Sequence, residues 1–235
     1  MKKYDDYILN YESLGFFRRT LEIQDFTQEN LLFDFSKRFV DIFFSLFALT
    51  VFSPVSAIIY LVIKITSPGP VFFSQRRVGK DGSVFFIYKF RSMKIETDPY
   101  EYSPEIKQNN NITTFGKFLR ASCLDEIPQF FNVLTGDMSI VGPRPEMEFI
   151  AEKYSLLEKR RLSVKPGITG IWQLKASRKQ LIHENLRYDL EYIENISLGS
   201  DFKIMLLTAW FIIKKIIKYE KNSLVHSSKP SRSSR

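Results

Sequence analysis

Residues 49–60, LTVFSPVSAIIY, lie inside the longest apolar run of the sequence and have a proline in their middle. No charged residue occurs over residues 42–63, and a run of this length can cross a hydrocarbon core of about 30 Å as one helix. Pro54 removes a backbone donor and crowds the preceding turn, while the hydroxyl of Ser53 can satisfy the carbonyl that is freed. The Ser53-Pro54 pair therefore predicts a sharp kink in the middle of the run.

Basic residues on both sides of this run bear on its path through a membrane. Lys37 and Arg38 precede the run, and Lys64, Arg76, Arg77 and Lys80 follow it. Because basic flanks favour the cytoplasmic side, both ends of the run are predicted to be cytoplasmic. Residues 37–66 would then form a re-entrant helix–break–helix that enters one leaflet and turns back. From these residues alone, a spanning helix that tolerates a proline is an equally good interpretation.

Composition and charge limit the classes of function. The chain has 235 residues, enough for one sizeable core, and a formal net charge of +8. Residues 201–235 carry eight basic against two acidic side chains, and residues 37–99 carry nine against four, a pattern that an anionic membrane surface attracts. No nucleic-acid-binding signature accompanies the charge, so no nucleic-acid partner is expected. The single cysteine, Cys123, excludes an intrachain disulfide and zinc-ligand spacing.

Local patterns outside the apolar run predict an α+β, mostly helical fold. Asp81-Gly82 separates two apolar-aromatic runs, which is a strong β-hairpin signal, and polar residues 95–114 predict a loop. Helices are expected over residues 115–121, 125–136, about 145–163 and about 178–195, with residues 165–170, KPGITG, as a turn.

The C-terminal part of the sequence combines an apolar stretch with basic residues. Residues 204–213 are almost wholly apolar, too short to span a membrane, and lead into KKIIKYEK. We therefore expect an amphipathic helix over residues 201–219 at a membrane interface, and a C-terminal core helix is a nearly equal interpretation. Residues 220–235 are expected to be a disordered basic tail, and the acidic residues 1–36 an N-terminal extension.

Two adjacent carboxylates, Asp125 and Glu126, stand at the start of one predicted helix. Adjacent helical residues point about 100° apart, so this pair does not resemble facing glycosidase carboxylates. A helix N-terminus suits a phosphate, and one carboxylate could hold Mg²⁺ while the other attacks phosphorus. Simple helix capping is the competing interpretation, and it is preferred for the pair taken alone.

Nearby arginines favour the chemical interpretation. Arg120 lies five residues before Asp125, and Arg144 stands between Pro143 and Pro145. Because the prolines fix φ on both sides, they preorganise an arginine fork that can grip a phosphate through two hydrogen bonds.

Several of these stretches together resemble the bacterial sugar transferases known as monotopic phosphoglycosyl transferases. The resemblance runs from about Lys37 to Asp201, through KRFVD, Ser53-Pro54, GPVFFSQRRVG, YKFRSMK, LRASCLDEIPQFFNVLTGDMSIVGPRPE, KPGITGIWQ and YDLEYIENISL. It implies a cytosolic catalytic domain over residues 67–200, held at the cytoplasmic face of the bacterial inner membrane by the re-entrant residues 37–66. The spanning interpretation is thereby disfavoured.

The resemblance also implies an activity and a set of site residues. Members transfer a sugar-1-phosphate from a UDP-sugar to undecaprenyl phosphate and so initiate capsule, exopolysaccharide or O-antigen assembly. Asp125 would attack the β-phosphorus and carry the phospho-sugar covalently, and Glu126 would bind Mg²⁺. Arg120 and Arg144 match positions expected to meet phosphates, and further charged positions tied to activity match Lys89, Asp189 and Asp201.

The sequence departs from the family pattern in two places and leaves three questions open. Cys123 stands where the family usually has serine, and Arg178 lies one place later than the family's arginine, in a loop that could touch the sugar. The identity of the sugar, the polymer that results and whether two copies of the chain pair are not determined. A catalytically silent membrane scaffold for glycan-assembly enzymes is the alternative function.

Overall fold

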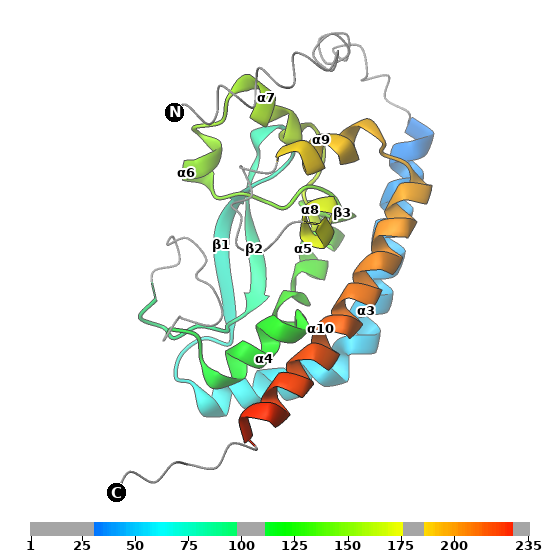
Figure 1. Ribbon diagram of the computed structural model, residues 1–235. Coiled ribbons are helices and arrows are strands. Elements are labelled where there is room, and N and C mark those ends of the chain that lie inside the picture. The colour runs from blue at the N-terminus through cyan, green and yellow to red at the C-terminus, as the bar shows by residue number, and fades with distance from the viewer. Residues whose placement is uncertain (1–30, 98–110, 176–185, 228–235) are drawn as a thin grey trace, which may run out of the picture. The chain divides into compact units, whose positions relative to one another are not determined.

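The computed structural model describes residues 31–97, 111–175 and 186–227, and the chain divides after Lys37 into two units. The predicted N-terminal extension is therefore described only from Leu31. Within the larger unit, Arg38–Arg235, helices outnumber strands and two small sheets are present, as expected for a mostly helical α+β protein (Figure 1).

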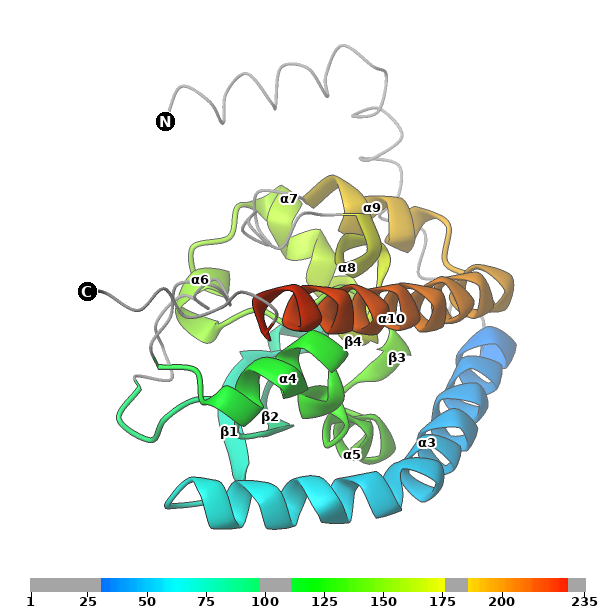
Figure 2. The same ribbon diagram turned by 60° about the horizontal axis from the view of Figure 1, so that its bottom comes forward.

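The apolar run forms one continuous helix, α3, Leu31–Thr66, that contains Pro54. Ser53 Oγ donates to the carbonyl oxygen of Thr50 at 2.8 Å, the acceptor that residue 54 would use if it had an N–H. The predicted replacement of the lost bond by the serine hydroxyl is thus confirmed. Figure 2 shows α3 bending between its blue first part and its cyan second part. The path of this helix through a membrane stays a prediction.

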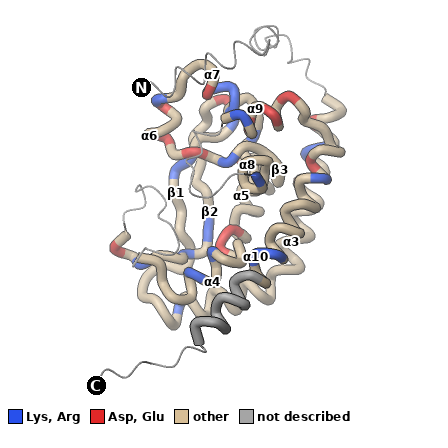
Figure 3. The backbone as a smooth tube through the Cα atoms, in the orientation of Figure 1, with Lys and Arg blue, Asp and Glu red and all other residues tan. Residues whose placement is uncertain are grey.

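The surface of α3 is largely apolar, and its charged residues are confined to its two ends (Figure 3). By length and composition the helix could cross a membrane, with a mean hydropathy of 2.3 over its most apolar window and 17% of that window buried. Large apolar side chains lie exposed along its length: Phe39, Phe43, Phe47, Val51, Ile58, Leu61 and Ile65.

Polar and apolar contacts attach α3 to the rest of the larger unit. The two terminal nitrogens of Arg38 donate to the carbonyl oxygens of Val133 and Leu134, in the last turn of α5, Gln129–Thr135. Asp41 Oδ1 accepts from the backbone N–H of Ile140 at 3.0 Å. Further along, buried side chains of α3 enter a core cluster with the hairpin and α4: Ile59, Ile63, Val71, Phe90, Leu119 and Ile127.

The predicted hairpin is confirmed. Strands β1, Phe72–Val78, and β2, Val84–Phe90, pair antiparallel with Val78 opposite Val84. The turn between them is η2, Lys80–Gly82, where Asp81 and Gly82 both have positive φ. Asp-Gly is favoured at such positions, which is why this local signal placed the hairpin correctly.

A second, parallel pair of strands was not predicted. It joins β3, Ser139–Val141, to β4, Gly167–Thr169, which lies in the stretch interpreted as a turn. A Cβ on Gly167 would lie 2.1 Å from the backbone nitrogen of Gly142, so only glycine permits this close approach. Three-residue strands carry too little alternation to be recognised, and the pairing itself is non-local.

The expected single helix over residues 145–163 is wrong. The structure has three short elements instead: α6, Glu148–Ala151, α7, Leu156–Lys159, and η4, Arg160–Ser163. Ser155 and Glu158 form a capping box that starts α7 anew, so a local signal interrupts the longer pattern.

The other helices agree with expectation in part. Helix α4, Thr114–Ser122, is confirmed, whereas the stretch 125–136 divides into η3, Leu124–Glu126, and α5. Gly136, at φ 96, ends α5 as predicted. Helix α8, Ile171–Lys175, precedes residues 176–185, which lie outside the described part, and α9, Leu186–Glu194, forms the end of the predicted helix 178–195.

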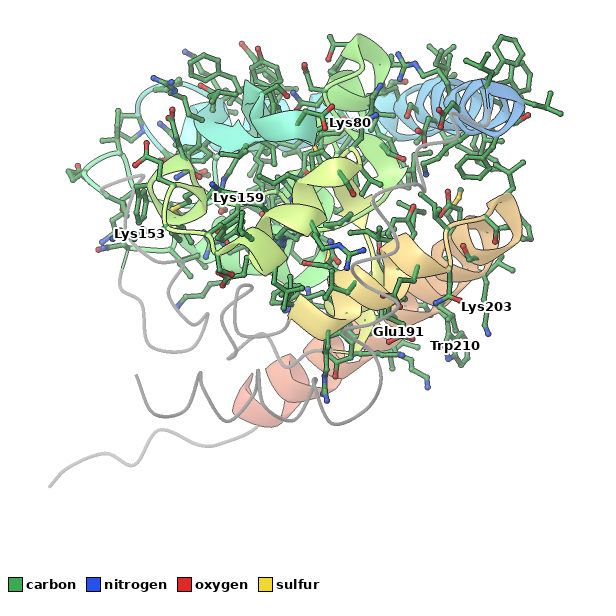
Figure 4. The ribbon with its side chains drawn as sticks, turned by 90° about the horizontal axis from the view of Figure 1, so that it is seen from above. Lys80, Lys153, Lys159, Glu191, Lys203 and Trp210 are labelled. Atoms are coloured by element: carbon green, nitrogen blue, oxygen red, sulfur yellow. The ribbon has the colours of Figure 1, made fainter. Side chains whose placement is uncertain are left out.

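The C-terminal helix α10, Leu198–Ser227, is longer than the predicted helix 201–219. It continues eight residues into the stretch expected to be a disordered tail, and residues 228–235 are not described. One side of α10 packs inward through Asp201 and Ile204, as a core helix would. Its other side is apolar and exposed, and Trp210 projects outward from it (Figure 4): Phe202, Leu206, Leu207, Trp210, Ile213 and Ile217.

Candidate active site

Asp125 and Glu126 lie in η3, directly after α4. Cys123, with φ 60, ends α4 in the left-handed conformation and redirects the chain into η3. Lys215 of α10 holds this junction, since its Nζ donates to the carbonyl oxygen of Arg120 at 2.7 Å and lies 3.2 Å from Cys123 Sγ. The carboxylate pair thus sits on a tight turn rather than in the first turn of a long helix, and Asp125 is buried.

Three of the predicted site residues meet at one oxygen atom. Lys89 Nζ lies 2.8 Å from Glu126 Oε1, and an Arg144 terminal nitrogen lies 3.3 Å from the same oxygen. The three side chains come from β2, from η3 and from the segment after β3. All are partly shielded from solvent, with exposed fractions between 18% and 29%, so their charges interact more strongly than they would on an open surface.

Burial and, to a smaller extent, neighbouring positive charge lower the pKa values of two basic groups in this place. Burial lowers the pKa of Lys89 below its usual value, which Glu126 opposes and the Arg144 charge reinforces. Burial also lowers the pKa of Arg77 to about 10, and Arg144 acts in the same direction. An anionic ligand beside these groups would favour their charged forms. The electrostatics therefore suit a phosphate-bearing substrate.

Arg144 is oriented by its surroundings as well as by its flanking prolines. Its guanidinium lies over the ring of Trp172 in α8, with 6.0 Å between the guanidinium carbon and the ring centroid. This contact and the Glu126 ion pair hold the fork pointing toward η3. The sequence expectation of a preorganised arginine next to the carboxylate pair agrees with this geometry.

The remaining predicted site residues lie in other contacts. Arg120 Nε donates to Ser92 Oγ at 2.9 Å, just past the end of β2. Asp189 is 2.7 Å from an Arg161 nitrogen, and Asp201 Oδ1 is 2.9 Å from the Tyr192 hydroxyl, with both acids almost completely buried. Burial and the neighbouring Asp201 raise the pKa of this tyrosine.

These placements separate the predicted site residues into two groups. Lys89, Glu126 and Arg144 are brought together, whereas Asp189 and Asp201 form contacts inside the protein. Arg178 lies outside the described residues. The predicted contact of each residue with substrate stays a prediction.

Two arginines near the site, Arg77, which is partly exposed, and Arg161, which is buried, were not predicted to belong to it. Arg77 and Arg161 both flank the carboxylate of Glu146, at 3.8 Å and 3.9 Å. Each stands in the sequence beside a second arginine, Arg76 and Arg160. The sequence of an Arg-Arg pair does not show which arginine points inward. The register of the hairpin determines this for Arg77, and the short helical element η4 determines it for Arg161.

The carboxylates can be tested as ligands for a metal. No group of three or more metal-ligating side chains occurs within the described residues. Mg²⁺, however, usually takes one or two carboxylates together with substrate phosphates. Because η3 offers the two adjacent carboxylates of Asp125 and Glu126, the donor set fits a magnesium ion that is held jointly with an anionic substrate, not a cage made by protein alone.

A groove opens next to the Arg144 segment. It has a volume of about 560 Å³ and lies between the hairpin tip, α6 and η4, with Asp81, Glu148 and Lys159 among its lining residues. Val78 and Leu162 line both this groove and a small pocket that Arg144 and its two prolines enclose. Its volume is in the range of small-molecule sites, and it offers carboxylates to sugar-like hydroxyl groups.

Comparison with known proteins assigns the family. Residues 32–215 match the family model described as bacterial sugar transferase, which covers most of the chain. The chain belongs to the bacterial sugar transferase family. The resemblance read from the sequence motifs is thus confirmed. The matched residues include α3, the hairpin, the carboxylate pair and much of α10, so the whole arrangement described above belongs to the family's common region.

Individual relatives agree with this assignment. The chain is 42% identical over 182 residues to a UDP-glucose:undecaprenyl-phosphate glucose-1-phosphate transferase of Escherichia coli (strain K12). The matched region covers 74% of this chain and 39% of the relative. It is 41% identical over 186 residues to the galactosyl transferase CpsE of Streptococcus agalactiae serotype III (strain NEM316), covering 74% and 41%.

A shorter relative is matched over most of its length. The exopolysaccharide production protein ExoY of Rhizobium meliloti (strain 1021) is 33% identical over 188 residues, covering 74% of this chain and 83% of the relative. The chain thus spans about two fifths of the length of the first two relatives and most of ExoY.

Proposed function

We propose that this chain is an enzyme that transfers a sugar-1-phosphate from a UDP-sugar to undecaprenyl phosphate, the step that initiates assembly of an exopolysaccharide, capsule or O-antigen. Relatives whose names state this reaction support the proposal. The observation that carries it is the meeting of Lys89 and Arg144 at the carboxylate of Glu126, next to the buried Asp125. A silent scaffold has no need of two cations gathered at one carboxylate.

Asp125 is the nucleophile of the proposed first step. One of its carboxylate oxygens bonds to the β-phosphorus of the UDP-sugar, the bond from that phosphorus to the bridging oxygen breaks, and UMP leaves with the electron pair. Lys89 feels the charge of Asp125, which places an ammonium near the developing anion. In the second step an oxygen of undecaprenyl phosphate attacks the same phosphorus and releases the Asp125 carboxylate.

Arginines and a divalent cation would offset the phosphate charge. Arg144 is held toward Glu126 and would turn its fork to a substrate phosphate, and Arg120 would do the same from the end of α4. Mg²⁺ held by Glu126 and the substrate diphosphate would neutralise charge on the departing UMP.

The acceptor lipid requires the site to lie at headgroup depth. Residues 37–66 would enter one leaflet and return, so that both ends of α3 are on the cytoplasmic face of the inner membrane. The exposed apolar side chains of α3 and of α10 support contact with lipid. Arg38 and Asp41 join α3 to α5 and β3, which would keep the catalytic part at a fixed distance from the bilayer.

UMP release by the purified chain in lipid nanodiscs tests this function. With undecaprenyl phosphate present and a panel of UDP-sugars, we expect UMP release with one or more donors and, without acceptor, a phospho-sugar adduct on Asp125 by mass spectrometry. Asp125→Asn should abolish both, and Asp137→Asn, an aspartate outside the site, should leave both unchanged. Undiminished UMP release by Asp125→Asn would remove that residue from the mechanism, and no release with any donor would favour the scaffold.

A further inference from the structure

Each carbonyl oxygen of residues 143–146, the segment that carries Arg144, accepts a hydrogen bond from another segment. The four acceptor–donor pairs are Pro143 with Gly167 N at 2.8 Å, Arg144 with an Arg161 terminal nitrogen at 3.0 Å, Pro145 with an Arg77 terminal nitrogen at 3.3 Å, and Glu146 with Val78 N at 3.0 Å. Two donors are backbone groups of strands. The other two are arginine side chains, of which Arg161 is buried and Arg77 is partly exposed, so the segment is fixed partly by charged residues.

Arg161 makes the bond closest to the site. Its side chain is only 2% exposed. One terminal nitrogen donates to the Arg144 carbonyl and forms an ion pair with Asp189 Oδ2, which lies 2.7 Å away. The other terminal nitrogen donates to the Tyr154 hydroxyl at 2.7 Å. Burial alone would lower the pKa of Arg161, but Asp189 and its other neighbours raise it above the usual value, so the guanidinium is charged.

Asp189 offsets the free-energy cost of burying the Arg161 guanidinium. A buried guanidinium without a counter-charge is strongly destabilising, and Asp189 on α9 supplies the carboxylate. The nearest other carboxylate, that of Glu146, lies 3.9 Å from Arg161 and 3.8 Å from Arg77, so it is shared between two cations. Asp189 thus compensates Arg161 from outside the segment that Arg161 holds.

The flanking prolines do not fix every backbone angle around Arg144, and the bond from Arg161 adds a further restraint. Pro143 and Pro145 fix their own φ angles, and Pro145 biases Arg144 toward extended conformations. They do not fix how the Arg144 peptide plane is oriented relative to η3, where Glu126 lies. The hydrogen bond from Arg161 to the Arg144 carbonyl sets that orientation directly.

We infer that Arg161 and Asp189 are positioning residues for Arg144: the buried ion pair holds the Arg144 backbone so that its guanidinium reaches Glu126 and the substrate phosphate. This inference rests on the proposed function, and it assigns Asp189 a role inside the protein in place of substrate contact. Lysine at position 161 would keep the charge next to Asp189, but its single ammonium nitrogen cannot occupy both positions from which the two guanidinium nitrogens reach Tyr154 and the Arg144 carbonyl.

A double-mutant cycle between Arg161→Lys and Arg144→Ala in the full chain tests the inference. We expect Arg161→Lys to lower kcat/KM for UMP release by about tenfold to a hundredfold, because small misplacements of a catalytic group have effects of this size. On the Arg144→Ala background the same change should cost less than twofold, since its effect passes through Arg144. A purely structural role would give the same loss on both backgrounds.

A matched control and a second variant complete the experiment. Glu191→Gln lies on α9 two residues after Asp189, and its carboxylate pairs with the exposed Lys175 at 2.8 Å, so UMP release should not change (Figure 4 labels Glu191). If Arg161→Lys does not fold, Arg161→Gln with Asp189→Asn removes both buried charges together and should show the same non-additivity.

The outcomes separate the two proposals. If the wild-type chain releases UMP and Arg161→Lys is fully active, the positioning role is wrong and the proposed function stands. The same holds if Arg161→Lys lowers kcat/KM by the same factor with Arg144 and with Arg144→Ala. A wild-type chain that releases no UMP with any donor overturns the proposed function, and with it the inference. The thermal shift produced by UDP, followed through the same cycle, gives a readout that does not depend on turnover.

Discussion

Lys89 and Glu126 form an ion pair of 2.8 Å that joins the second strand of the hairpin to the turn carrying Asp125. Both side chains are 18% exposed, so the pair is sheltered without being sealed from substrate. It ties the rigid β-hairpin to the carboxylate pair, and it keeps an ammonium group beside the place where phosphate charge would gather.

Glu126→Gln removes the charge from this pair while keeping its shape. We expect UMP release to fall by about a hundredfold or more, because Lys89 and Arg144 lose their shared counter-charge and Mg²⁺ loses a ligand. Steady-state assays at saturating donor measure this. The matched control is Glu191→Gln, whose partner Lys175 is exposed. A comparable loss of UMP release in that variant would show that the effect is not specific to Glu126.

Removal of Mg²⁺ should stop UMP release without unfolding the chain. The described residues hold no three-carboxylate cage, so the ion is expected to enter with substrate and to contribute nothing to the fold of the free protein. EDTA should abolish activity, Mg²⁺ should restore it, and circular dichroism should be unchanged throughout. Full activity in EDTA would exclude the metal from the reaction.

Pro54→Ala should change the path of α3 in the membrane. Alanine restores the N–H that can bond to Thr50, whose carbonyl now accepts from Ser53, and so favours a straight helix. On a Cys123→Ser background, a cysteine at position 5 should be protected from external reagents in intact cells when Pro54 is present. With Pro54→Ala we expect a labelled fraction.

The proline outside the helix gives the control for this experiment. Pro68 follows α3, and Pro68→Ala should not alter labelling at position 5. Labelling of the otherwise unchanged protein would mean that the N-terminus lies outside the cytoplasm, and the re-entrant path would then be wrong.

Asp41→Ala should destabilise the junction between α3 and β3. Asp41 Oδ1 accepts from Ser139 Oγ and from the N–H of Ile140, both at 3.0 Å in a buried place, and alanine leaves these donors unpaired. We expect a loss of about 1–3 kcal/mol, measured by thermal unfolding in detergent. Asp34→Ala, at an exposed position in the first turn of the same helix, should have little effect, and equal losses would argue against the buried bonds.

Local sequence signals predicted those features that a few adjacent residues determine. Asp81-Gly82 gave the hairpin because its backbone needs positive φ there, and Gly136 gave the end of α5 for the same reason. Ser53-Pro54 predicted the loss of a backbone donor and its replacement by the serine hydroxyl, since Ser53, Pro54 and the acceptor Thr50 lie within about one helical turn. The prediction of a single helix over residues 145–163 failed because the capping box at Ser155 starts a new helix inside the longer helical pattern.

The candidate site was predictable as a set of residue types but not as a constellation. Asp125, Glu126 and Arg144 were recognised from adjacency, from flanking prolines and from the family's motifs. Two features depend on contacts between segments far apart in the chain. Arg144 and Lys89 contact the same carboxylate oxygen of Glu126, and Arg77 and Arg161 donate to backbone carbonyls of the Arg144 segment.

By itself, the sequence determined the apolar run with its proline, the hairpin, the acidic pair and the family, because these depend on short-range backbone geometry and on residue order. Tertiary structure alone decided which charges are buried and with whom they pair. Burial of a charge is a property of the folded surroundings, and Asp189 illustrates this: a residue that sequence assigns to substrate lies against Arg161 in the interior, where its charge is needed to balance another.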